Sequence, residues 1–395
     1  MRTNSNKKVH NIKRDPYKLL QRVALILALI LAVGAGLFYL CSIAVTRDFV
    51  KTRDRIETEN AEGAAAFQAE MDALRASNNV ADKNEIRSES GEDLPFWEKE
   101  LNGKVWRIQD EGGAGLENTS TITMDRSQLI NGGLLLLNSW HSLPADFSEE
   151  GLVVVGTTGD YKVPVQDSSV KLFQPAFESV VEALKAAKDE AGLEHYIVME
   201  GYRSVIEQQE LFNEKMEDLS SRYTGERLIA ETKKFVNYPG TSDYHSGMSF
   251  RMDVYERGNS ELNDQKFQAQ SAQGAWLTEN CWRFGIAFRF PSKDFPNTSW
   301  EDKSYKTGVS SQLNLYRYVG KAHAAAMTYL DLNLESYLNW LHEKRVLTIF
   351  AGAKPQYFIT CQPVEGRYVD FQLPCGTEYE LSLDNTGYAV AACVL

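Results

Sequence analysis

The chain has three successive regions that differ in their content of apolar residues. Residues 23–45 form an uncharged apolar run that is long enough to cross a bilayer as a helix. Residues 46–93 are polar, with acidic and basic side chains interleaved, and this composition favours a stalk. From about residue 94 onward, apolar and aromatic residues are dense enough for a globular domain with a full core.

Within the globular region, the spacing of apolar residues predicts individual elements. Residues 134–140 read as a short apolar strand, 196–199 as a second strand and 334–341 as a helix. Another helix is predicted because four apolar residues recur at helical spacing and define one buried face: Phe177, Val180, Val181 and Leu184.

After residue 345 the pattern becomes β. A turn at 384–387, Asp-Asn-Thr-Gly, predicts a hairpin between the last two strands. We therefore expect an α+β domain over 94–345, in which helices pack on a small antiparallel sheet, followed by a β-rich subdomain over 346–395. The strands predicted in that subdomain are 348–350, 357–361, 368–373, 379–383 and 388–394.

Charge before the apolar run predicts the topology. Seven Lys or Arg residues and one acid, Asp15, precede residue 23. The positive-inside rule keeps this basic tail, residues 1–22, in the cytoplasm and places the carboxyl-terminal bulk outside it. The run exceeds the apolar core of a cleaved signal peptide, so we expect an uncleaved signal anchor and a single-pass protein of the cell membrane.

Composition excludes some functions and leaves the cysteines open. The net charge of −12 and the lack of a basic stripe beyond residue 22 argue against a nucleic-acid partner. Three cysteines fall in the β-rich region. A Cys361–Cys375 bridge would clamp one hairpin, and Cys393 competes for either partner.

Four motifs in order point to a known family. They are Glu-Gly-Tyr-Arg-Ser at 200–204, Pro-Gly-Thr-Ser at 239–242 with the residues up to 253, the run at 276–291 that ends in Arg-Phe-Pro, and the run at 307–320 that ends in Arg-Tyr-Val-Gly. Together they resemble the VanY-type D-alanyl-D-alanine carboxypeptidases over roughly residues 130–395. The resemblance implies a zinc peptidase fold that acts on peptidoglycan stem peptides.

The same resemblance implies that the metal ligands are replaced. Ser242 and Gly247 fix the register of the second motif, which puts Tyr244 at the position of the family's histidine ligand and Arg251 at that of its aspartate ligand. Arginine stays protonated and would repel a dication.

The last motif gives the remaining two positions. Thr307 and Arg317 fix its register, with Gln312 at the family's general base and Leu315 at its third ligand. Leucine cannot ligate a metal, and an amide does not take a proton from water as a carboxylate does. We therefore expect no catalytic residues and no cofactor in the usual places.

An alternative set of metal ligands would allow zinc catalysis. His245 and Asp253 lie next to Tyr244 and close to Arg251, and a one-residue bulge in the strand would present them to a metal instead. The chain would then be an active carboxypeptidase that trims peptidoglycan.

Parts of the substrate pocket survive. The resemblance places Arg203, Gln208 and Ser242 at pocket-lining positions, and the planar fork of an arginine suits a terminal carboxylate. A structural ion pair is the alternative for Arg203, and a solvated helix face is the alternative for Gln208.

Arg251 needs a compensating partner in either reading of the site. It pairs internally with Asp243, Asp253 or Glu256, or it joins Arg203 in a cationic pocket that binds a carboxylate.

Three functions follow. The chain is a pseudoenzyme that binds stem peptides or a cell-wall enzyme, an active zinc carboxypeptidase, or a membrane-tethered scaffold that acts through its β-rich subdomain.

Overall fold

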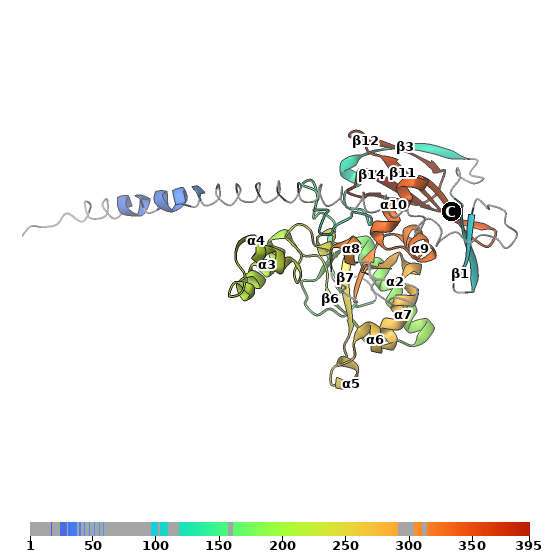
Figure 1. Cartoon of the computed structure of the whole chain (residues 1–395), viewed down its shortest axis with the longest axis horizontal. Helices are drawn as coiled ribbons and strands as arrows, with labels where there is room; N and C mark the ends of the chain where they lie inside the picture. Colours follow the sequence, from blue (N-terminus) through green and yellow to red (C-terminus); the bar gives the residue numbers. More distant parts are fainter. Residues whose placement is uncertain are drawn as a thin grey trace, which may run out of the picture. The chain divides into compact units, whose positions relative to one another are not determined.

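The computed structural model describes single helical positions and short helical stretches between residues 17 and 58, and then residues 96–101, 103–109, 118–156, 161–290, 304–309 and 314–395. The chain divides into two compact units, residues 1–58 and 59–395 (Figure 1). None of the helices that the described residues form is long and apolar enough to span a bilayer. Most of the basic tail 1–22 and of the stalk 46–93, and part of the predicted anchor 23–45, lie outside the described residues.

A four-stranded antiparallel sheet forms the centre of the larger unit. Its strands are β6 (Tyr196–Glu200), β7 (Ser249–Val254), β9 (Leu315–Tyr318) and β8 (Ile286–Phe288), in that order across the sheet. Helix α2 (Gln174–Ala191) packs against it. The α+β class and the small antiparallel sheet are confirmed.

Helix α2 shows why the apolar spacing was informative. Phe177, Val180 and Leu184 are buried on its sheet-facing side, and a proline in its first turn and Gly192 in a left-handed conformation after its last turn mark its ends. The predictions for β6 and for α10 (Leu334–Lys344) are also confirmed.

The remaining elements of this region are short. Helix α3 (Val205–Leu219) and helix α4 (Gly225–Lys233) pack against each other. The others are β4 (Leu152–Val154), β5 (Lys171–Phe173), α5 (Ser260–Asn263), α6 (Phe267–Gln270), α7 (Ala272–Asn280), α8 (Ser304–Thr307), α9 (Lys321–Leu330) and the 3-10 turns η1 (Arg126–Gln128), η2 (Asp243–Ser246) and η3 (Cys281–Phe284).

All five strands predicted after residue 345 are present, and three earlier strands join them. A six-stranded sheet and a two-stranded sheet result, and the two-stranded sheet lies beside β11 and β14 (Figure 1). Because 96–125 contributes strands to both sheets, the β-rich region is not built from 346–395 alone. The sheets are β1 (Phe96–Leu101), β2 (Lys104–Gln109), β10 (Val346–Ala351), β11 (Lys354–Pro363), β14 (Tyr388–Val394) and β13 (Tyr379–Leu383), and β12 (Tyr368–Pro374) with β3 (Thr119–Asp125).

The predicted hairpin between β13 and β14 is confirmed. Asn385 and Gly387 have φ values of 63° and 102°, a region that asparagine and glycine tolerate better than other residues. None of the alternative bridges among Cys361, Cys375 and Cys393 is present, because all three cysteines are free in this structure. Cys361 is buried within the six-stranded sheet, whereas Cys375 is exposed beyond the end of β12.

The strand expected at 134–140 is wrong, although Leu134 to Leu137 are all buried. Side chains, not a neighbouring strand, donate to the carbonyl groups from Leu135 to Leu137 and to that of Gly133. The Arg317 guanidinium donates to the carbonyls of Gly133 and Leu135, and the Asn385 amide donates to that of Leu136. Apolar periodicity detected the burial but could not reveal these donors.

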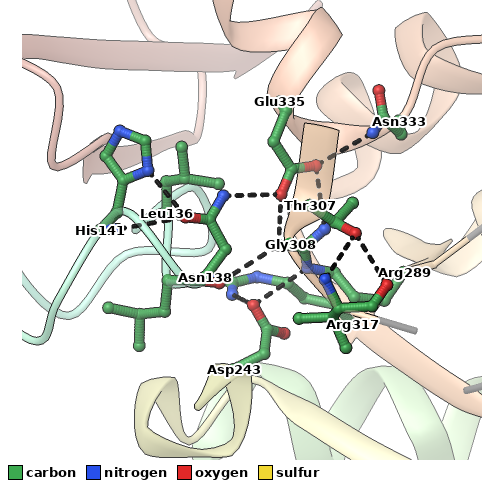
Figure 2. A network of polar contacts seen from close by, with 12 residues as sticks. Leu136, Asn138, His141, Asp243, Arg289, Thr307, Gly308, Arg317, Asn333 and Glu335 are labelled. Atoms are coloured by element: carbon green, nitrogen blue, oxygen red, sulfur yellow. Dashed lines mark hydrogen bonds and ion pairs between the residues drawn. The ribbon is translucent and has the colours of Figure 1, made fainter. Parts of the chain in front are cut away.

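A buried ionic network ties these parts together (Figure 2). The Asp243 carboxylate accepts hydrogen bonds from Arg289 Nε at 2.9 Å and from Arg317 Nη1 at 2.7 Å. Arg289 also forms a bidentate ion pair with Glu335 of α10, in which Nη1 donates to Oε2 at 3.1 Å and Nη2 donates to Oε1 at 2.8 Å. All four side chains are at most 2% exposed, and the two cations balance the two anions.

Replacing Asp243 by alanine should lower the free energy of unfolding by about 3 to 5 kcal/mol, because it leaves two buried guanidinium groups short of an anion. Urea denaturation of the purified protein measures this loss. Asp189→Ala on the exposed side of α2 is the matched control and should stay within about 0.5 kcal/mol. A loss for Asp243→Ala as small as that of the control would contradict the structural role assigned to the network.

Candidate functional site

A cavity of about 290 Å³ opens between α3 and the segment 235–244. Its lining includes the buried residues Gln208, Ser242 and Tyr244 and the partly exposed Arg203. It also includes the exposed side chain of Phe235. Three of the four predicted substrate-binding residues therefore line one cavity, and Arg251 does not line it.

The local sequence explains why Arg203 reaches this cavity. Strand β6 ends at Glu200, and Gly201 follows where a Cβ atom would lie 2.4 Å from the carbonyl oxygen of Lys171. Ser204 then begins α3 through a capping box with Glu207, in which the Ser204 hydroxyl accepts from the Glu207 amide and the Glu207 carboxylate accepts from the Ser204 amide. Arg203 lies in the tight connection between the strand and the capped helix.

Polar and aromatic contacts hold the Arg203 side chain. It donates to Gln208 Oε1 at 2.8 Å and to Glu200 Oε2 at 2.6 Å, and its guanidinium lies 4.7 Å from the centre of the Tyr244 ring. The side chain is 21% exposed, so it retains access to the cavity. Both sequence alternatives for Arg203 thus apply together, since it forms an ion pair and also faces the cavity.

Gln208 does not lie on a solvated helix face. It is 1% exposed, accepts from Arg203 and donates to the carbonyl of Asn237 at 2.7 Å. It therefore links α3 to the opposite wall of the cavity.

The three positions assigned to metal ligands come together in space. Arg251 on β7 is the direct cross-strand partner of Leu315 on β9, and Leu315 shares an apolar cluster with Tyr244, Phe290 and Val309. Gln312, at the base position, lies outside the described residues.

This side-chain set does not fit a catalytic zinc ion. Leu315 has no donor atom, and Arg251 carries a permanent positive charge. Burial raises the pKa of Tyr244 well above its usual range, so its phenol stays neutral. Across the described parts of the chain, no group of three or more His, Cys, Asp or Glu residues is arranged to hold a metal ion.

The structure uses both ring nitrogens of His245 for hydrogen bonds. Nε2 accepts from the Gly240 amide at 3.1 Å, so Nδ1 carries the proton that it donates to the Arg203 carbonyl at 2.6 Å. Asp253 accepts from the amide of Val254. Among the described strands β6, β7 and β9, the register shifts only between Val198 and Glu200, and β7 pairs with β9 without a bulge over 249–251.

The partner of Arg251 is a residue that sequence reasoning missed. Arg251 Nη2 donates to Glu200 Oε1 at 2.8 Å, and not to Asp243, Asp253 or Glu256. Glu200 and Arg251 face each other across β6 and β7. Glu200 belongs to the first of the four motifs, but only the strand register shows which basic residue it meets.

Comparison with known proteins agrees with this architecture. A family model described as VanY, D-alanyl-D-alanine carboxypeptidase, matches residues 170–321. The chain contains a VanY-family domain. That match spans β6 to β9 and therefore the whole described part of the cavity.

Individual relatives extend the similarity. A D-alanyl-D-alanine carboxypeptidase of Enterococcus faecium is 27% identical over 302 residues, which cover 75% of this chain and 85% of the relative. One from Enterococcus faecalis is 28% identical over 56% of this chain and 72% of the relative. The crystal structure of the D,D-dipeptidase VanXYg, in complex with a D-Ala-D-Ala phosphinate analogue, covers 70% of this chain and 99% of its own, with a TM-score of 0.54 and 19% identity. That structure shows the shared fold of the VanY domain.

Stability of the VanY domain should fall on acidification, partly through His245. Burial lowers the pKa of His245 from 6.5 to about 4. Below pH 6.5 the unfolded chain takes up a proton at His245, whereas the folded chain does so only near pH 4. The free energy of unfolding of the wild type therefore falls between these two pH values. His245→Gln should therefore cost stability at pH 7, and that cost should shrink by about 3 kcal/mol by pH 4.

Urea denaturation at pH 7, 5.5 and 4 measures this difference between variant and wild type. His195→Asn is the control, because His195 is exposed and asparagine tolerates its φ of 68°. A cost of His245→Gln that does not change with pH would contradict the assigned hydrogen bonding.

Proposed function

We propose that this chain is a membrane-anchored, extracytoplasmic pseudoenzyme that binds peptidoglycan stem peptides through the cavity beside Arg203. The observation that carries the proposal is a contrast within one site. The metal-ligand positions hold a phenol, a guanidinium and an aliphatic side chain, while the cavity next to them keeps its arginine.

The cavity has the chemistry to recognise the carboxyl end of a peptide. The guanidinium of Arg203 has five N–H groups. One N–H on Nη1 donates to Gln208, and one on Nη2 donates to Glu200. A ligand carboxylate can take the remaining donors, and charge-assisted bonds of this kind are strong and directional. The aromatic and aliphatic groups of Tyr244 and Leu211 offer apolar contact for small side chains such as those of alanine.

This site lacks the metal ligands and the carboxylate base that a zinc peptidase uses for hydrolysis. In a zinc peptidase the metal lowers the pKa of a bound water, and a carboxylate base takes its proton. Here Arg251 and Leu315 cannot hold the metal, and Gln312 replaces the base. Binding without cleavage is what remains.

The sequence supports the proposed location. The basic tail 1–22 and the apolar run 23–45 fit a signal anchor, and the stalk 46–93 would keep the VanY domain within reach of the cell wall. The relatives named above are D-alanyl-D-alanine carboxypeptidases, which makes a D-Ala-D-Ala terminus the first ligand to test. The alternative, an active enzyme that uses His245 and Asp253, has less support because both ring nitrogens of His245 are already bonded.

A synthetic stem pentapeptide that ends in D-Ala-D-Ala should bind the detergent-solubilised full chain saturably, and no D-alanine should be released. Arg203→Ala should weaken binding at least about tenfold, because it removes a charge-assisted pair with the peptide carboxylate. Calorimetric titration gives the affinity, and a D-alanine assay gives the turnover.

The control is Arg222→Ala, an exposed arginine in the connection between α3 and α4 that does not line the cavity. It should leave the affinity unchanged. Absence of saturable binding would overturn the stem-peptide proposal and favour a protein partner, whereas zinc-dependent release of D-alanine would favour the active enzyme.

A further inference from the structure

Glu200 lies at the centre of the polar groups behind the cavity. One of its carboxylate oxygens accepts from Arg203 Nη2 at 2.6 Å, and the other accepts from Arg251 Nη2 at 2.8 Å. Its charge also helps burial to raise the pKa of the Tyr244 phenol. A single carboxylate therefore binds the arginine that lines the cavity and the arginine at the aspartate-ligand position, and acts electrostatically on the tyrosine at the histidine-ligand position.

The backbone aims Glu200 at these partners. The register of β6 against β7 shifts between Val198 and Glu200, and such a bulge turns the next side chain toward a new direction. Past the bulge, Glu200 faces Arg251 directly across the two strands. Arg251 in turn faces Leu315 on the next strand. Glu200, Arg251 and Leu315 therefore lie side by side on three neighbouring strands of the central sheet.

The two guanidinium groups of this cluster, Arg203 and Arg251, share the Glu200 carboxylate. The Glu207 carboxylate also interacts electrostatically with Arg203. Arg251 Nε is buried without a hydrogen-bond partner among the described residues. The side chains of Glu200, Arg203 and Arg251 are 21 to 34% exposed, so solvent weakens each pair without removing it. A ligand carboxylate would take the N–H groups of Arg203 that Glu200 and Gln208 leave free.

We infer that Glu200 is a positioning residue that holds Arg203 toward the cavity, so that recognition of a peptide carboxylate in this chain needs no metal ion. The inference rests on the proposed binding function and adds to it the residue that replaces the metal centre as the organiser of the site. Without the Glu200 charge, Arg203 and Arg251 would repel each other at close range, and Arg203 would lose the bond that orients its fork.

The experiment is a titration of the full chain with the D-Ala-D-Ala pentapeptide, with and without EDTA. Wild-type affinity should be unchanged by EDTA. Glu200→Gln, which keeps the shape of the side chain and removes its charge, should weaken binding about three- to tenfold, a modest effect because the site is partly exposed. Glu210→Gln, an exposed acid on α3, is the control and should bind as wild type does.

A double-mutant cycle separates positioning from general stability. If Glu200 acts through Arg203, Glu200→Gln should have no further effect on binding in the Arg203→Ala background, whereas a merely structural role would give additive losses. Should Glu200→Gln fail to fold, Glu200→Asp, which keeps the charge and shortens the side chain, replaces it in the same cycle.

The outcomes are distinct. Wild-type protein that does not bind the peptide at all would refute the proposed function itself. Binding that EDTA abolishes, or that Glu200→Gln leaves at wild-type strength, would overturn the role assigned to Glu200 while leaving peptide binding in place.

Discussion

The buried Asp243 carboxylate is the interaction on which the rest of the site depends. Burial alone would raise its pKa, but the adjacent Arg289 and Arg317 guanidinium groups hold the pKa below its usual value, so the carboxylate stays charged. It lies in the turn η2, immediately before Tyr244 and His245. Through Arg289 it connects to Glu335 on α10, and the turn that carries Tyr244 is thereby joined to that helix (Figure 2).

This arrangement would let a VanY domain keep its shape without the metal, as the proposed function requires. The network around Asp243 uses none of the three ligand positions, and the cluster of Tyr244, Phe290, Val309 and Leu315 fills their place with apolar contacts. A second and more exposed ionic group, centred on Glu200, compensates the charge of Arg251. In the proposed pseudoenzyme, these two groups would provide the order that ligand bonds to a metal supply in a zinc peptidase.

Much of this could be predicted from the sequence, because it depended on local periodicity or on short motifs. The helix α2, the strand β6 and the five strands after residue 345 all followed from apolar spacing. The motifs likewise brought Arg203, Gln208 and Ser242 to one cavity. What the sequence could not show were contacts between distant segments. Strands β1 to β3 complete sheets whose other members lie more than two hundred residues away. The carbonyls of Gly133, Leu135 and Leu136 are likewise bonded by side chains of distant segments, Arg317 of β9 and Asn385 of the β13–β14 turn. The partner of Arg251 required the register of β6 against β7, including the bulge before Glu200.

The central claim is that the VanY domain organises its site without zinc. The most direct measurement is the zinc content of the purified full chain, by elemental mass spectrometry after dialysis against a trace of zinc. If the site is organised without zinc, the molar ratio of zinc to protein should be near zero. A ratio near one that is lost in His245→Gln or in Asp253→Asn would contradict it, and would mean that the neighbouring residues hold a metal after all.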